Sequence, residues 1–204
     1  MLIQALYNIV DSIFVAQIGE NALTAVSLAF PVQNLIIAVG IGTGIGINSL
    51  LSRRLGERRF DDANAAAENG ILLSLCKWLV FAIFGGLFSE AFFRAFTENP
   101  EIISMGTDYL TVCTVFSFGC FMQFACERIL QATGITIYNM ITQATGAIIN
   151  IILDPIMIFG LLGCPRMGVA GAAVATVIGQ IVAAALALWF NLRKNHEIAL
   201  SRRI

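Results

Sequence analysis

The chain has 204 residues, of which 58% are apolar and only 12% are charged, and its formal net charge is −1. Because a soluble domain carries about 25% charged residues, this composition indicates a membrane protein. A balanced charge without a long basic tract argues against nucleic acid as a partner. The five cysteines form no C-x-x-C pair and there is one histidine, so we expect neither a structural metal site nor a disulfide framework.

Six apolar runs are long enough to cross a bilayer, which takes about 20 residues each. They lie at about residues 1–18, 23–51, 63–89, 102–131, 135–161 and 168–192. The sequence therefore predicts an all-α membrane protein with a single bundle of six transmembrane helices over residues 1–204. We expect the first helix to be truncated, because it begins at Met1 without a flanking segment. The second is long, and we expect it to tilt or to continue beyond the membrane.

Basic residues gather in alternate loops. The basic residues on one side are Arg53, Arg54, Arg58 and Arg59 after the second run, and Arg193, Lys194, Arg202 and Arg203 after the sixth. The loops on the other side contain only Arg166, with Arg94 just before them. By the positive-inside rule, this asymmetry predicts a multi-pass protein of the plasma membrane, a cell inner membrane, with both termini in the cytoplasm.

Two acidic residues interrupt the apolar runs. Asp154 precedes Pro155 in the fifth run, and Asn150 lies one turn earlier on the same helix face. The first run repeats this arrangement with Asn8 and Asp11. A carboxylate near the bilayer midplane costs at least about 2.5–3.5 kcal/mol, so each needs a polar partner, a water-filled cavity or a proton. An acid in such a place predicts a functional site, against the simpler interpretation of a structural hydrogen bond.

Glycines and prolines mark further positions. Gly40, Gly42, Gly44 and Gly46 form two overlapping G-x-x-x-G pairs in the second run, which predicts close helix packing. Pro31 and Pro155 are either tolerated kinks or hinges for alternating access.

Three charged residues within or beside the runs have simpler interpretations. For Lys77 we favour an ammonium group that reaches the cytoplasmic interface over one paired with an acid in the membrane. Glu127 and Arg128 are expected to form a solvated patch at that interface.

Several stretches together resemble the amino-terminal lobe of multidrug and toxic compound extrusion (MATE) transporters. They are Asn8-Ile-Val-Asp-Ser-Ile-Phe-Val-Ala-Gln-Ile-Gly19, Ala25-Val-Ser-Leu-Ala-Phe-Pro31, Ser52-Arg-Arg-Leu-Gly56, Asn150-Ile-Ile-Leu-Asp-Pro155 and Gly168-Val-Ala-Gly-Ala-Ala-Val-Ala-Thr176. The resemblance implies a six-helix lobe that is normally joined to a second such lobe. It further implies a substrate cavity between or within the lobes, and export driven by inward flow of protons or sodium ions.

The resemblance also implies roles for particular residues. Asp11 and Asp154 are expected to belong to a cation-linked polar network, with Asn150 and Asn8 beside them. Thr176 and Gln180 are candidate further members, because a spacing of four places them on one face of the last helix. A buried carboxyl group could take up a proton. The oxygens of Asp11, Asp154 and Asn150 could instead bind Na⁺, since hard cations prefer oxygen.

The function that these expectations describe is cation-coupled antiport of organic, cationic compounds, with the lipid bilayer, a small substrate and a second lobe as partners. No cofactor is expected besides the coupling ion. One alternative is a lipid-linked saccharide flippase of the same superfamily, which should show more cationic residues than Lys77 alone. Another is a non-transporting truncated lobe that needs a partner chain. An enzyme is not expected, because no nucleophile and base set, metal cluster or phosphate loop is present.

Overall fold

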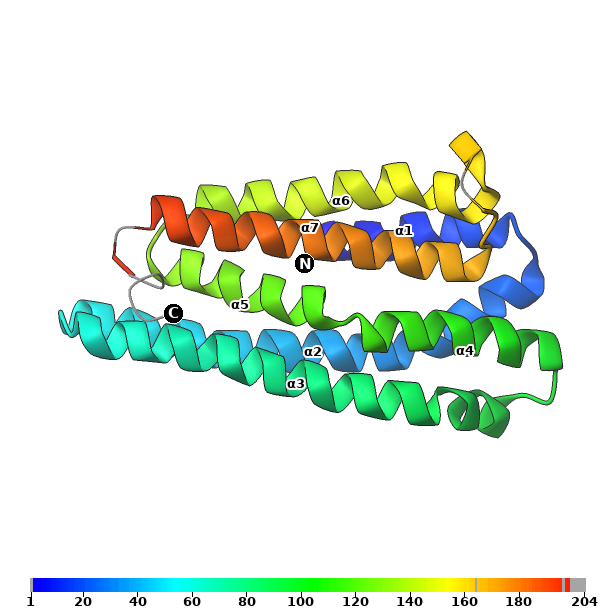
Figure 1. The fold of residues 1–204 in the computed structure, drawn as a ribbon, viewed down its shortest axis with the longest axis horizontal. Coiled ribbons are helices and arrows are strands. Elements are labelled where there is room, and N and C mark those ends of the chain that lie inside the picture. Colours follow the sequence, from blue (N-terminus) through cyan, green and yellow to red (C-terminus); the bar gives the residue numbers. More distant parts are fainter. Residues whose placement is uncertain (1, 164, 196, 199–204) are drawn as a thin grey trace.

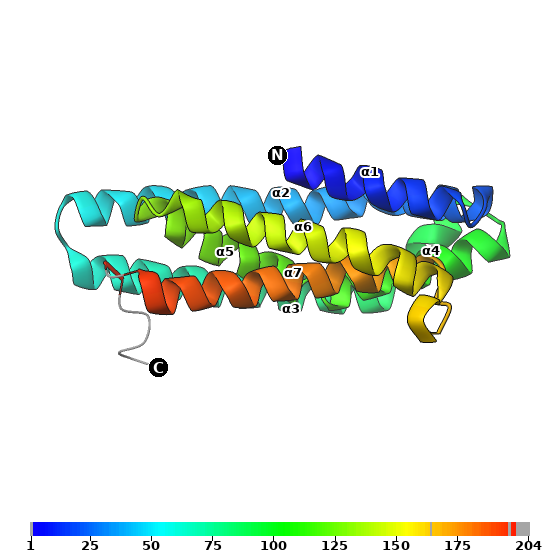
Figure 2. The same ribbon diagram turned by 90° about the horizontal axis from the view of Figure 1, so that it is seen from above.

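The computed structural model describes residues 2–163, 165–195 and 197–198, with side chains from Ile9 onward. Seven α-helices make up most of this part of the chain, and it contains no strand. They are α1 (Leu2–Ala16), α2 (Glu20–Gly56), α3 (Phe60–Phe96), α4 (Pro100–Val115), α5 (Phe118–Ala132), α6 (Thr136–Phe159) and α7 (Val169–Lys194), with a short 3₁₀ turn, η1 (Leu161–Gly163), before α7. The helices lie nearly parallel in one elongated bundle (Figures 1 and 2).

Four of the helices, α2, α3, α6 and α7, are long and apolar enough to cross a membrane, and α4 with α5 makes a fifth span if the bent pair is counted as one. The 15 residues of α1 are fewer than a full span needs. The predicted all-α membrane bundle is therefore confirmed. At about 1.5 Å per residue, the 37 residues of α2 reach roughly 55 Å, well beyond the hydrocarbon core.

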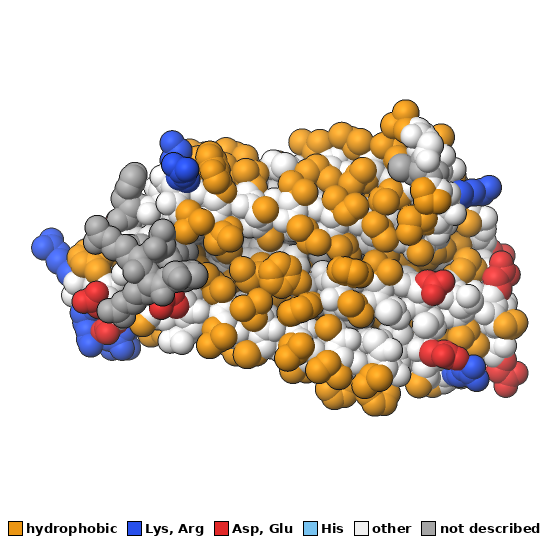
Figure 3. Space-filling view, in the orientation of Figure 1, with side chains coloured by type: hydrophobic (Ala, Val, Ile, Leu, Met, Phe, Trp, Pro, Cys, Tyr) orange, Lys and Arg blue, Asp and Glu red, His pale blue; other side chains and the backbone are white. Residues whose placement is uncertain are grey.

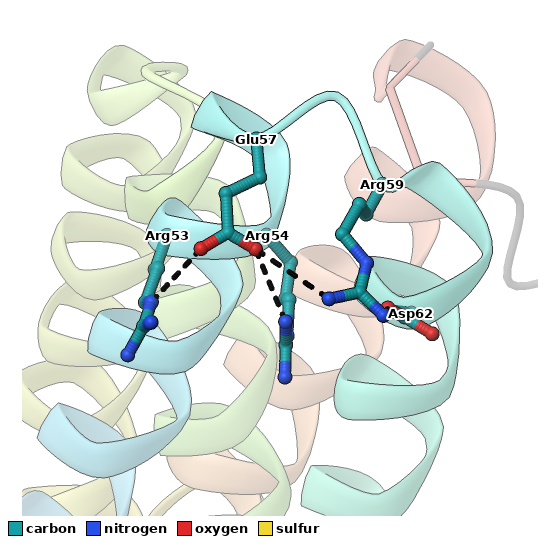
Figure 4. A network of polar contacts seen from close by, with 5 residues as sticks. All are labelled: Arg53, Arg54, Glu57, Arg59 and Asp62. Atoms are coloured by element: carbon teal, nitrogen blue, oxygen red, sulfur yellow. Dashed lines mark hydrogen bonds and ion pairs between the residues drawn. The ribbon is translucent and has the colours of Figure 1, made fainter.

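Charged side chains gather at the two ends of the bundle and apolar ones between them (Figure 3). The turn between α2 and α3 and the C-terminal end of α7 lie at the same end (Figure 1). At this end Glu57 accepts hydrogen bonds from Arg53 Nε at 3.0 Å and Arg54 Nη1 at 3.1 Å, and Arg59 pairs with Asp62 (Figure 4). Arg53 and Arg54 at the end of α2 thus share one end of the molecule with Arg193 and Lys194 at the end of α7, whereas Arg202 and Arg203 lie outside the described residues.

The fourth predicted span is not one helix. It breaks at Phe116 and Ser117, where α4 and α5 meet at an angle of 41°. The carbonyls that the break frees have partners, since Trp78 Nε1 donates to the Val115 carbonyl at 2.8 Å and Ser117 Oγ to that of Thr114 at 2.7 Å. Backbone groups at this depth need such partners because lipid supplies none.

Small residues set the spacing of the helices. A Cβ atom added at Gly40 would come within 2.7 Å of the Phe124 ring, and one at Gly44 within 2.8 Å of the Arg128 side chain, so these two glycines pack against α5. Gly42 faces open space. One of the two predicted G-x-x-x-G pairs therefore makes the close contact, and the other does not.

Candidate functional site

Four polar side chains from three helices meet between α1, α6 and α7. Asn150 Nδ2 on α6 donates to Asp154 Oδ1, one turn further on, at 3.2 Å, and to Thr176 Oγ1 on α7 at 3.1 Å. Thr176 Oγ1 lies 3.2 Å from Asp11 Oδ2 on α1 and donates to it. The carboxyl groups of Asp11 and Asp154 lie close enough to influence each other electrostatically. We call these four residues the acid cluster.

Close approach of α6 and α7 makes the acid cluster possible. A Cβ atom added at Gly171 would lie 2.5 Å from the Met157 carbonyl oxygen, and one at Gly179 would lie 2.9 Å from that of Gly146. The two backbones thus touch on both sides of Thr176. This spacing lets a short threonine side chain reach Asn150 on one helix and Asp11 on another.

The acid cluster is shielded from water but not saturated with hydrogen bonds. Asp154 and Asn150 are fully buried, and Asp11 is 4% exposed. Asp11 Oδ1, Asn150 Oδ1 and Asp154 Oδ2 have no partner in the part of the chain that the structure describes. Unpaired buried oxygens are costly, so this group of acceptors is suited to a proton or to a small hard cation.

A cavity begins at the acid cluster and extends between α1, α2, α4, α5, α6 and α7. It offers about 80 Å³ to the centres of water molecules, which is room for several waters, since one needs roughly 10–15 Å³. Two acids and no lysine or arginine are among its described lining residues, which are Asp11, Gln33, Ile36, Ile37, Cys113, Ser117, Cys120, Gln123, Phe124, Glu127, Gln143, Thr176, Val177 and Gln180. The cavity therefore favours positive over negative occupants.

The MatE family model matches residues 1–156, about three quarters of the chain. The chain belongs to the MATE family. Its relatives include a protein of Shewanella oneidensis named FAD transporter, which is 30% identical over 192 residues, a stretch covering 94% of this chain and 42% of that protein. The multidrug export protein MepA of Staphylococcus haemolyticus is 27% identical over 98% of this chain and 44% of its own length.

Solved MATE structures have the same fold. An outward-facing multidrug resistance MATE transporter matches with a TM-score of 0.90 at 30% identity, covering all of this chain and 44% of that one. An inward-facing MATE structure also matches with a TM-score of 0.90 at 30% identity, covering 97% of this chain and 44% of that one. The chain thus spans less than half the length of the relatives it matches.

The other predicted site residues of this MATE lobe lie in different surroundings. Gln180 lines the cavity next to the acid cluster. Asn8 belongs to α1, but its side chain lies outside the described residues. Pro31 is exposed on α2, and Pro155 is half-buried beside Asp154 on α6. Both helices continue through their prolines.

The expected solvated patch at Glu127 and Arg128 is wrong for Glu127, which is only 2% exposed and lines the cavity. Its carboxylate accepts hydrogen bonds from Gln123 Nε2 at 2.8 Å and Gln143 Nε2 at 2.9 Å. The sequence carried a signal for this burial. Cys120, Phe124 and Glu127 follow the helical spacing that places residues on one face.

Lys77 makes a contact that neither of its two interpretations includes. Its ammonium group stands 5.2 Å from the centre of the Phe121 ring, between α3 and α5. An ammonium ion over an aromatic face is attracted by the negative charge density of the ring. None of the ion pairs among the described residues includes Lys77, so the pairing with an intramembrane acid is not observed there either.

Proposed function

We propose that this chain is the amino-terminal lobe of an exporter that exchanges organic, cationic compounds for protons or sodium ions. Membership of the MATE family and relatives named for multidrug export support the export of small molecules. The single observation that carries the coupling role is the acid cluster, where buried carboxyl oxygens without partners meet a cavity.

The chemistry of the acid cluster supports cation coupling. Two neighbouring buried carboxylates cannot both be negatively charged without a large cost in free energy, so a proton or a metal cation stabilises the pair. The hydroxyl proton of Thr176 can serve either Asp11 Oδ2 or the Ala172 carbonyl, which lies 3.0 Å away. A change of occupancy at Asp11 can therefore release α1 from α7 without leaving the threonine unpaired.

A second lobe is supported by the surface of α2. Asn34 and Ser27 are exposed polar residues within its apolar span, on the same side as Pro31. Exposed amides are costly in lipid, so a polar cleft or a partner surface suits this face better than acyl chains. Because the chain covers only 42–44% of its relatives, a partner lobe in the same or another chain would complete the transporter.

Export of a flavin nucleotide, which the name of the Shewanella relative suggests, is a weaker candidate. Its diphosphate would carry negative charge into a cavity lined by Asp11 and Glu127 and by no described lysine or arginine. The same argument counts against a lipid-linked saccharide with a phosphate linkage. Like charges at close range in a site of low dielectric disfavour both anions.

The first prediction tests coupling in the complete transporter. We expect Asp11→Asn and Asp154→Asn each to abolish ethidium efflux from proteoliposomes driven by an imposed pH or Na⁺ gradient, because neither amide can take up the proton or supply the charge. Thermal melting of the purified variants should show an intact fold. Comparing the two gradients identifies the coupling ion.

Asp108→Asn serves as the matched control, since Asp108 is exposed on α4, away from the cavity, and its change should leave the efflux rate unaltered. If both acid-cluster variants export ethidium at the wild-type rate under both gradients, the coupling role is refuted.

A further inference from the structure

Glu127 forms a second acidic position in the same cavity. It lies on α5, and its two donors come from different helices, Gln123 from α5 and Gln143 from α6. Because each carboxylate oxygen accepts one of these hydrogen bonds, the orientation of the Glu127 carboxylate is fixed. Each oxygen retains capacity for a further hydrogen bond or an ion, since an ionised carboxylate offers about four acceptor positions.

Glu127 makes no ion pair in the described part of the chain, although the positive charge of the neighbouring Arg128 acts on it from a longer distance. The side chains that donate to it are neutral. The neighbouring Arg128 directs Nη1 to Gln131 Oε1 at 2.6 Å, and its aliphatic stem packs at Gly44. A buried carboxylate that no cation contacts is costly, so a positive group that enters the cavity can supply the missing contact.

The cavity wall next to Glu127 suits an organic cation. Phe124, one turn before Glu127 on α5, lines the same cavity. A cationic nitrogen is attracted both to a carboxylate and to the face of an aromatic ring, and desolvation strengthens both interactions. An anion or a strongly hydrated metal ion would not gain from the ring.

This position is separate from the acid cluster. The hydrogen bonds of Glu127 and those of Asp11, Asn150, Asp154 and Thr176 share no residue. On α6, Gln143 precedes Asn150 by two turns, which corresponds to about 10 Å along the helix. A coupling ion and a substrate can therefore occupy the two positions without competing for the same ligands.

We propose that Glu127, oriented by Gln123 and Gln143, binds the positive nitrogen centre of an organic cation whose apolar part packs against Phe124. This inference deepens the proposed function by naming the residue that selects the charge of the substrate. Glu127 acts here as a binding residue, whereas the acid cluster binds the coupling ion.

Equilibrium binding tests this assignment without any ion gradient. Ethidium is titrated into the purified complete transporter in detergent, and its fluorescence gives Kd. We expect Glu127→Gln to raise Kd at least about tenfold, the loss of one charge interaction in a poorly solvated site. Glu98→Gln removes the same charge from an exposed position outside the cavity and should leave Kd unchanged.

A Kd for Glu127→Gln within twofold of the wild-type value overturns the assignment. If that variant does not fold, as judged by its melting curve, Glu127→Asp replaces it, because the shorter side chain keeps the charge but withdraws it from Phe124. A Kd within twofold of wild type for Glu127→Asp is then the contradicting result.

The outcome is independent of coupling. Ethidium binding that depends on Glu127 would stand even if Asp11→Asn and Asp154→Asn left gradient-driven efflux intact. Conversely, normal coupling with binding that is indifferent to Glu127 would refute only the present inference.

Discussion

At the scale of single residues, charges in this protein fall into two environments. Those in the cavity, such as Asp11 and Glu127, are buried and have neutral hydrogen-bond donors. Those at the end of the bundle, such as Glu57 with Arg53 and Arg54, are exposed ion pairs. Exposed pairs contribute little to stability because water screens them, so the two groups should respond differently to pH and salt.

The ion pairs at Glu57 give a pH-dependent prediction. The hydrogen bond from Arg53, aided by Arg54, holds the pKa of Glu57 below its usual 4.5. A carboxyl whose pKa is lower in the folded state adds stability above its unfolded pKa, and this contribution is lost as pH falls through the folded value. We therefore expect Glu57→Gln to have a slightly lower Tm than wild type at pH 7, and the difference to shrink as the pH falls below 4.5 and through the folded pKa.

Melting curves in detergent at several pH values measure this difference. The same difference should shrink at high salt. A gap in Tm that widens as the pH falls would contradict the argument.

At the scale of helices, the backbone contact of α6 with α7 positions the acid cluster. A methyl group at Gly179 would lie 2.9 Å from the Gly146 carbonyl oxygen and 3.5 Å from Asn150 Cβ, and no flexible side chain could yield. We expect Gly179→Ala to reduce the free energy of unfolding by about 1–3 kcal/mol and to separate Thr176 from Asn150. Chemical denaturation measures the first effect, and loss of gradient-driven efflux reports the second.

Gly42→Ala is the matched control. It makes the same change within a long helix, but at a position that faces open space. Alanine favours helix more than glycine does, so this variant should be as stable as wild type or slightly more so. If both changes destabilise the protein equally, the loss of stability in Gly179→Ala does not come from the close contact at Gly179.

The sequence predicted some features of the helices and not others. Apolar length predicted the spans, and the spacing of four placed Asn150 beside Asp154, as their hydrogen bond confirms. The break at Phe116 and Ser117 was not predicted, because the apolar run continues through it and no proline lies there. Just after the break, a Cβ atom at Gly119 would lie 2.9 Å from the Ile181 backbone nitrogen, so α5 packs closely against α7 there.

The cavity could not be predicted from the sequence either. Thr176 and Asp11 are 165 residues apart, and Gln143 and Glu127 lie on different helices. Periodicity identifies the inward face of each helix, but only packing decides which faces share a cavity. Glu127 was misjudged for this reason, since its charge and its place near a helix end suggested solvent.

At the scale of the whole molecule, the bundle has one basic end and one end with mostly acidic groups (Figure 3). The positive-inside rule predicts that the α2–α3 turn faces the cytoplasm. We expect Asp61→Cys, at the start of α3, to react with a membrane-impermeant maleimide only after cells are permeabilised. Glu98→Cys, between α3 and α4, should react in intact cells.

These two positions are both exposed, so each controls for the other. Labelling of Asp61→Cys but not Glu98→Cys in intact cells would reverse the orientation. It would also place the turn between α1 and α2 on the cytoplasmic side, since that turn lies at the end of the bundle opposite the α2–α3 turn (Figure 1).

The indole that supports the break between α4 and α5 offers an intrinsic optical reporter. The chain contains two tryptophans, and Trp189 is half exposed on α7, whereas Trp78 holds the Val115 carbonyl beside cavity-lining residues. In a Trp189→Phe background, the emission wavelength of Trp78 would therefore report how much water surrounds the break between α4 and α5. Rearrangement at the centre of the lobe could then be timed in real time, with no dye attached.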